Sequence, residues 1–143
     1  MEPRLSIITL GVENMARAYR FYHEGLGFPT GGKADSPIVF FQMQGTTLAI
    51  YPREKLAQDV VPNSDGQGSG FSGITIAHNT REKSQVDETL QRAEAAGGKI
   101  LKPAQNTDWG GYSGYFADPD GHLWEVAWAE SWQFHPDGSL VIE

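Results

Sequence analysis

Apolar residues in this chain fall into short runs typical of strands, separated by stretches with helical spacing. Residues 5–10 form an apolar run of the length expected for a buried strand. Met15, Tyr19, Tyr22 and Leu26 then advance by 4, 3 and 4 residues, which is the spacing of one helix face. Asn14 precedes this helix and can cap it with its side-chain oxygen. Further strands are predicted over residues 37–43 and 47–51.

The second half of the chain repeats this order. A strand is predicted over residues 71–77, and Val86, Leu90, Ala93 and Gly97 repeat the helical spacing of 4, 3 and 4. The local sequence repeats as well, since Ile74-Thr75-Ile76 resembles Ile8-Thr9-Leu10 and Gly121-His122-Leu123-Trp124-Glu125-Val126 resembles Gly45-Thr46-Thr47-Leu48-Ala49-Ile50. The remaining strands are predicted over residues 99–102, 112–117 and 123–128. The pattern favours an internal duplication, and the alternative is two similar β-turns in an unrelated α+β fold.

Two segments lie outside the repeated units. Residues 55–70 are rich in Asp, Asn, Ser, Pro and Gly, which is typical of a linker with little structure of its own, or of a lid over a site. Residues 131–143 contain Trp132, Phe134 and Leu140, and are too apolar for a free tail. We expect this tail to cover the core or a dimer partner.

Composition narrows the classes of function. A chain of 143 residues is about the size of one domain, and its hydrophobic content of 39% is ordinary for a globular protein. No apolar run reaches the length of a membrane span, and the first residues do not resemble a secretory signal. The absence of cysteine excludes disulfides and thiolate sites, and fits a cytoplasmic protein. The net charge of −7, with scattered Lys and Arg, indicates neither nucleic acid nor membrane as a partner.

Three stretches of sequence resemble the vicinal oxygen chelate superfamily, which contains glyoxalase I, bleomycin-resistance proteins and extradiol dioxygenases. They are residues 8–12, residues 18–28 and the stretch 116–126, in which Asp118-Pro119-Asp120-Gly121 precedes a strand containing Glu125. The resemblance implies an α+β fold of two βαβββ modules, whose curved eight-stranded sheet surrounds a cleft with the helices outside. The single domain would comprise module one (about 5–54), the linker (about 55–70), module two (about 71–130) and the tail (131–143).

The resemblance also implies where a divalent metal would bind. The family's ligand positions correspond to Ile7, Ala49, Gly73 and Glu125 in this chain. Isoleucine, alanine and glycine side chains have no lone pair, whereas a transition-metal site needs about three His, carboxylate or thiolate ligands. We therefore expect no metal cofactor, with a divalent metal held by other residues as the alternative. The four histidines are scattered along the sequence and do not indicate a replacement site.

Glu125 is the main candidate for chemistry. Strand alternation places it on one face with Leu123 and Ala127, and places Trp124, Val126 and Trp128 on the other, as core. Because the resemblance places Glu125 at a metal-ligand position, and these positions face the cleft in the family, the Glu125 face is expected to line the cleft. There the carboxyl can act as a general acid or base, bind a ligand, or form a structural hydrogen bond. The same alternation directs further side chains toward the cleft, namely Thr9, Ala49, Tyr51 and Thr75.

An aromatic segment in the second half is a second candidate. Trp109 and Tyr112 flank two glycines, which allow close backbone approach beside stacking surfaces, although a surface loop folded onto the core would have the same sequence. We expect Trp109, Tyr112 and Glu125 to contribute to ligand binding. The prediction is a metal-independent, homodimeric, small-molecule-binding protein. The alternative is a lyase, isomerase or dioxygenase that uses Glu125 as an acid/base or with an unrecognised metal site.

Overall fold

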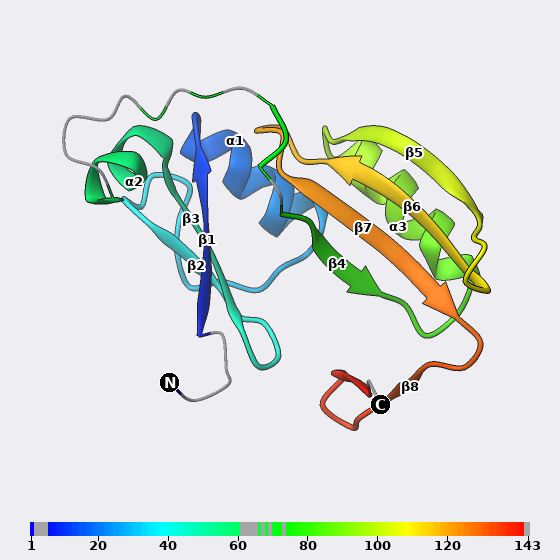
Figure 1. Ribbon diagram of the computed structural model, residues 1–143. Coiled ribbons are helices and arrows are strands. Elements are labelled where there is room, and N and C mark those ends of the chain that lie inside the picture. The colour runs from blue at the N-terminus through cyan, green and yellow to red at the C-terminus, as the bar shows by residue number, and fades with distance from the viewer. Residues whose placement is uncertain (2–5, 61–65, 67, 69, 73, 142–143) are drawn as a thin grey trace. The chain divides into compact units, whose positions relative to one another are not determined.

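The computed structural model describes the chain except residues 2–5, 61–65, 67, 69, 73 and 142–143 (Figure 1). It divides the chain into two compact units, Met1–Ser72 and Gly73–Glu143. Each unit combines a mixed sheet with helices, so the α+β class predicted from the sequence is confirmed. In the described part of the chain, no helix is long and apolar enough to cross a membrane.

The first unit forms a three-stranded sheet in the order β1-β3-β2. Strand β1 pairs in parallel with β3, and β2 pairs with β3 in the antiparallel direction. Helix α1 continues without a break into a π-helical segment, η1, and both connect β1 to β2. The elements are β1 (Ile7–Val12), α1 (Met15–Tyr19), η1 (Arg20–Gly25), β2 (Val39–Phe41), β3 (Thr47–Pro52) and α2 (Arg53–Val60).

The α1–η1 helix buries Ala18, Phe21 and Tyr22, whereas the other residues of the predicted stripe, Met15, Tyr19 and Leu26, are only half-buried. The side chain of Asn14 caps it by accepting a 2.8 Å hydrogen bond from the backbone N–H of Arg17. Tyr22 is fully buried, and its ring lies 5.6 Å from that of Phe41 and 5.8 Å from that of Phe28. These contacts place the core of the unit on the Phe41 side of the sheet, where Ile50 is also fully buried.

The first unit contains fewer strands than the βαβββ order requires. Within its described residues, no strand forms between η1 and β2. Pro29, Pro37 and two glycines interrupt this stretch, and proline cannot donate a hydrogen bond to a neighbouring strand. The connection is fastened to β2 by the hydroxyl of Thr30, which donates a 2.7 Å hydrogen bond to the carbonyl of Phe40.

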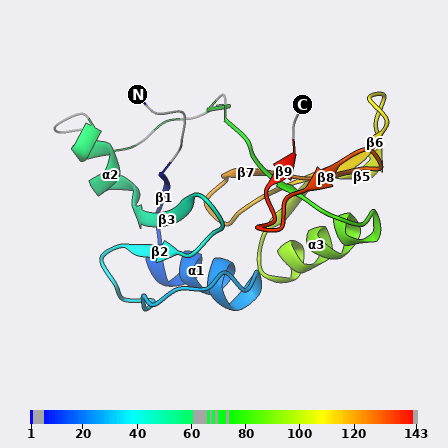
Figure 2. The same ribbon diagram turned by 90° about the horizontal axis from the view of Figure 1, so that it is seen from below.

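The second unit forms a four-stranded sheet in the order β4-β7-β6-β5, with one face covered by α3 (Figures 1 and 2). Strand β4 is parallel to β7, whereas β5, β6 and β7 form an antiparallel meander. A short hairpin, β8–β9, follows. The elements are β4 (Ile76–Asn79), α3 (Ser84–Ala95), β5 (Lys99–Asn106), β6 (Gly111–Ala117), β7 (Leu123–Ala129), β8 (Gln133–Phe134) and β9 (Leu140–Val141).

Helix α3 buries the predicted stripe against the sheet. Val86 and Ala93 are fully buried and Leu90 nearly so. A Cβ atom added at Gly114 of β6 would lie only 2.6 Å from Cδ1 of Leu90, so glycine provides the space that this leucine occupies. Val126 and Trp124 are buried on the same side, as predicted for the core face of β7.

The first part of the segment expected as a linker or a lid, about residues 55–70, is helical. Residues 53–60 form helix α2, because this part of the segment consists of good helix formers and its prolines and glycines come later. The helix packs on β1 at Gly11, where an added Cβ would lie 3.3 Å from Cδ2 of Leu56. Nε of Arg53 donates a 2.7 Å hydrogen bond to the carbonyl of Gly66, which holds Gly66 beside α2.

Candidate functional site

Glu125 forms a hydrogen-bonded pair with Tyr115 on the sheet of the second unit. The two residues lie opposite each other in the register of β6 and β7. The hydroxyl of Tyr115 donates a 2.9 Å hydrogen bond to Oε1 of Glu125. Both side chains are half-buried. A carboxylate with one oxygen already bound keeps acceptor capacity on the other, so the pair can still bind a donor or a cation.

The pair lies on the side of the sheet opposite α3, here called the Glu125 face. Pairing in register gives this face Ala77 of β4 beside Glu125, and the pair Ser113–Ala127 one step along β6 and β7. Ser113 and Ala127 are both buried, whereas Ala77 is exposed. Ala77 therefore offers an accessible apolar side chain beside the polar pair.

The surroundings of Tyr115 favour its protonated form. Burial raises the pKa of Tyr115 above its usual value of 10.0, and the hydrogen bond to Glu125 and the negative charge of that carboxylate raise the pKa further. Tyr115 is thus a neutral hydrogen-bond donor at ordinary pH. The Tyr115 hydroxyl fixes the orientation of the Glu125 carboxylate. The sequence had indicated Glu125 but not Tyr115 as a site residue.

An aromatic stack borders the Glu125 face near the end of β7. An added Cβ at Gly111 would overlap the ring of Trp109, so this ring lies flat over Gly111. Gly111 points to the same side as Ser113 and Tyr115 because alternate residues of a strand share a face. Trp109 also stacks on Trp132 of the tail, with ring centroids 5.7 Å apart and planes 22° apart. The sequence analysis predicted Trp109 at a wall of the site but did not predict Trp132 there.

Tyr112 lies on the other side of the sheet from Glu125, although both were expected to contribute to ligand binding. Its hydroxyl donates to Asp87 of α3, at 3.2 Å from Oδ1 and 3.1 Å from Oδ2. The ammonium of Lys83 lies 4.7 Å from the ring centroid. The physical reason is strand alternation, since Tyr112 is an odd number of residues from Tyr115 and must face α3. Tyr112 thus joins α3 to β6.

The predicted site residues of the first unit share one face of its sheet. Thr9 pairs in register with Ala49, and Gly11 pairs with Tyr51. Ala49 is fully buried, whereas Thr9 and Tyr51 are half-buried. Helix α2 covers the Gly11 end of this face, which the sequence analysis had left open.

Thr75 occupies a different position from the one that the sequence repeat indicated. The repeat pairs it with Thr9, but in the structure Ala77 is the register partner of Glu125, just as Thr9 is the partner of Ala49. Thr75 precedes β4 and is exposed. The pairing in the second unit is therefore offset by two residues from the one that the local sequence repeat indicates.

The residues at the family's metal positions do not fit a metal. Ala49 offers a buried methyl group, Ile7 an apolar side chain that is 52% exposed, and Gly73 lies outside the described residues and has no side chain. Glu125, the one possible ligand, is hydrogen-bonded to Tyr115. Among the described residues, His, Asp and Glu side chains nowhere gather in threes that could hold a metal ion.

Comparison with known proteins agrees with this fold. Residues 4–126 match the Glyoxalase/Bleomycin resistance protein/Dioxygenase superfamily, and the chain belongs to this family. It is similar to the metallothiol transferase FosB of Shouchella clausii, with 32% identity over 126 residues that cover 83% of this chain and 75% of that protein. A solved glyoxalase-related enzyme from Fulvimarina pelagi is 37% identical, with a TM-score of 0.86 over 98% of both chains.

A more distant solved structure shows the same fold. The lactoylglutathione lyase of Agrobacterium tumefaciens has a TM-score of 0.67 and 22% identity, over 92% of this chain and 98% of that one. The fold and the family expected from residues 8–12, 18–28 and 116–126 are confirmed by the family match and by the similarity to the Fulvimarina pelagi structure.

Proposed function

We propose that this protein binds a small molecule on the Glu125 face without a divalent metal. The observation that carries the proposal is the 2.9 Å hydrogen bond from Tyr115 to Glu125, because it supplies the carboxylate with a protein partner in place of a metal. The ligand would present a cation or an N–H donor to Glu125. Its apolar part would contact Ala77, the exposed register partner of Glu125 in β4.

The residues at the family's metal positions and the surroundings of Glu125 both support this assignment. Ile7 and Ala49 offer no ligand atom, so a metal reaching Glu125 would lack the three protein ligands that such sites need. The half-buried carboxylate beside apolar residues can form charge-assisted hydrogen bonds, which are about twice as strong as neutral ones. The proposal includes a cytoplasmic protein, which the absence of cysteine supports.

A thermal-shift screen of metabolites and antibiotics tests the proposal. A ligand that binds only the folded protein raises its melting temperature. The screen is run in parallel on wild type and on Glu125→Gln, with Glu130→Gln as a matched control in the exposed turn after β7. We expect cationic or donor-rich hits whose stabilisation shrinks in Glu125→Gln alone. Hits that stabilise all three proteins equally would place binding elsewhere.

The second candidate function is an enzyme of the lyase, isomerase or dioxygenase type. It is favoured by the similarity to a metallothiol transferase and to a glyoxalase-related enzyme, each above 30% identity. Glu125 would then act as an acid/base, or with a metal site that other residues complete. Measuring the metal content of the purified protein distinguishes a metal-dependent enzyme from a metal-free binding protein.

A further inference from the structure

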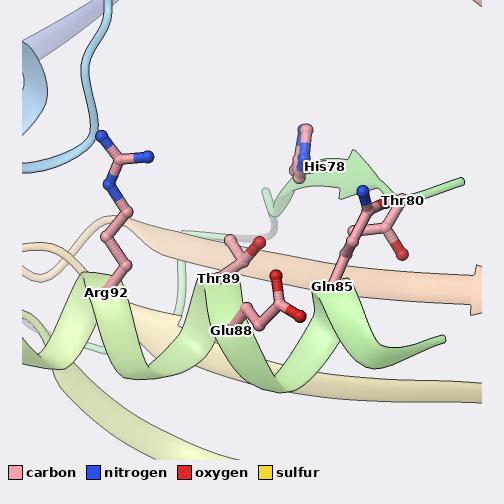
Figure 3. Close-up of a pocket in the computed structure, with 6 residues that line it drawn as sticks. All are labelled: His78, Thr80, Gln85, Glu88, Thr89 and Arg92. Carbon is pink, nitrogen blue, oxygen red and sulfur yellow. The ribbon is translucent and has the colours of Figure 1, made fainter. Parts of the chain in front are cut away.

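A concavity lies on the side of the second unit's sheet opposite Glu125. It has a volume of about 320 Å³ and is lined by His78, Thr80, Gln85, Glu88, Thr89 and Arg92 (Figure 3). His78 pairs with Val126, which places it on the α3 side of the sheet. The volume is at the lower end of the range of ordinary ligand pockets, ~300–1,000 Å³, and therefore suits a small ligand.

The lining comes from one face of helix α3 and from the end of strand β4. Four of the six residues are spaced along α3 by 3, 1 and 3 residues, so they form a single stripe beside the buried stripe of Val86, Leu90 and Ala93. Figure 3 shows Arg92 at one end of the concavity, Thr80 and Gln85 at the other, and Glu88 and Thr89 between them with His78 opposite.

The polar groups at the Gln85 end of the pocket already form hydrogen bonds within the protein. Oε1 of Gln85 accepts the backbone N–H groups of Arg81 and Glu82, each at 3.1 Å, and the Thr80 hydroxyl donates to the carbonyl of Glu82 at 3.0 Å. These hydrogen bonds fix the positions of Thr80 and Gln85 at this end of the pocket.

The middle of the pocket keeps hydrogen-bonding capacity for a ligand. In the described part of the chain, the side chains of His78, Glu88 and Thr89 have no hydrogen bond or ion pair. Desolvation by the surrounding protein lowers the pKa of His78 below 6.5, so at neutral pH its ring offers one donor and one acceptor without charge.

We propose that this pocket binds a small zwitterion of the α-amino-acid class, with its ammonium on Glu88 and its carboxylate toward Arg92. A simple anion would meet the carboxylate of Glu88, and a simple cation would meet the guanidinium of Arg92, whereas a zwitterion satisfies both. Arg92 has a further interaction in the protein, but a guanidinium carries five N–H donors and can serve two partners. Thr89 and the neutral His78 would complete the site.

The test is an NMR titration of the isotope-labelled full chain with L-alanine, L-glutamine and L-leucine. We expect saturable shifts at the backbone amides of His78 and Thr89 with at least one of the three. The N-acetyl and the carboxamide derivatives of that amino acid should bind about tenfold more weakly or worse, because each lacks one charge-assisted hydrogen bond. No saturable binding, or equal binding of both derivatives, would overturn the proposal.

Variants locate the site independently of the derivatives. Glu88→Gln and Arg92→Gln should each weaken binding about tenfold or more, whereas Glu94→Gln, an exposed position of α3 outside the pocket, should bind as wild type. All three positions are exposed, so unchanged melting temperatures are expected. Unchanged affinity in both pocket variants would show that the amino acid binds elsewhere. Glu125→Gln should leave this titration unchanged, which keeps the result separate from the function proposed for the Glu125 face.

Discussion

Tyr115 donates a 2.9 Å hydrogen bond to Glu125 across the β6–β7 pair. This contact gives a half-buried carboxylate a fixed orientation and a neutral donor as its partner. Two of the family's metal positions are occupied in this chain by Ile7 and Ala49, which cannot bind a metal. Glu125, at another of these positions, instead forms a hydrogen bond with Tyr115. The predictions below follow from this pair and from the packing around it.

Replacing Glu125 with Gln should weaken binding of a cationic hit from the screen about tenfold or more. The amide keeps the shape but removes the charge, and a hydrogen bond to a charged group contributes about 1.5–3 kcal/mol. Isothermal titration of wild type, Glu125→Gln and the control Glu130→Gln measures the change. If Glu125→Gln binds as wild type does but melts several degrees lower, Glu125 has a structural role and the proposed site is wrong.

Tyr115 should make stability depend on pH in the alkaline range. Its pKa is raised in the folded state, so the folded protein holds this proton more tightly than the unfolded chain does. The resulting stabilisation is fully present below the unfolded pKa of about 10 and is lost as pH rises through the higher folded pKa. Denaturant unfolding from pH 8 to 11 should therefore show a smaller alkaline loss in Tyr115→Phe than in wild type.

Tyr112 serves as a reference for that experiment. The pKa of Tyr112 is also raised, by desolvation and by Asp87, so Tyr112→Phe should reduce the alkaline loss in the same pH window. An identical slope in Tyr115→Phe and wild type would contradict the role given to Tyr115.

The purified protein should contain no stoichiometric divalent metal. The reason is the loss of ligand atoms at Ile7, Ala49 and Gly73. Elemental analysis after expression with added Zn, Ni, Fe and Mn measures the content. One tightly held metal per chain that disappears in Glu125→Ala would favour the enzyme and would falsify the metal-free proposal.

Gly114→Ala should destabilise the fold by about 1–3 kcal/mol, the usual cost of overpacking a core. The added Cβ would lie 2.6 Å from Cδ1 of Leu90 and 2.9 Å from backbone atoms of β5, which cannot move aside. Gly31→Ala is a matched control, because its Cβ would meet no atom within 4 Å and its φ is not positive. Urea unfolding of both variants checks the difference, and equal midpoints would show that α3 packs elsewhere.

The protein should be a homodimer in solution. The expectation comes from the apolar tail, whose Trp132 stacks on Trp109 while Trp109 remains 51% exposed. An exposed aromatic stack of this kind favours burial against a partner. Light scattering at micromolar concentration should give twice the 15.7 kDa of the chain. A monomer mass at that concentration would count against the prediction.

Local sequence determined most of the elements and one half of the candidate site. The spacing of Val86, Leu90 and Ala93 predicted α3 and its buried side, because helical periodicity is a property of neighbouring residues. The turn at Asp118 also contained a signal that the sequence analysis did not use. A hairpin pairs residues equidistant from its turn, and Ala117 opposite Leu123 puts Tyr115 opposite Glu125.

Tertiary structure decided the features that depend on contacts between distant residues. Tyr112 faces α3 and not the Glu125 face, and Trp132, which follows β7, stacks on Trp109, which precedes β6. Helix α2 covers Gly11, and the α3 pocket exists because the end of β4 brings His78 beside Glu88. Sequence periodicity fixes which side of an element is apolar, but it contains no information about which distant element that side meets. Packing and register supply this information only once the chain has folded.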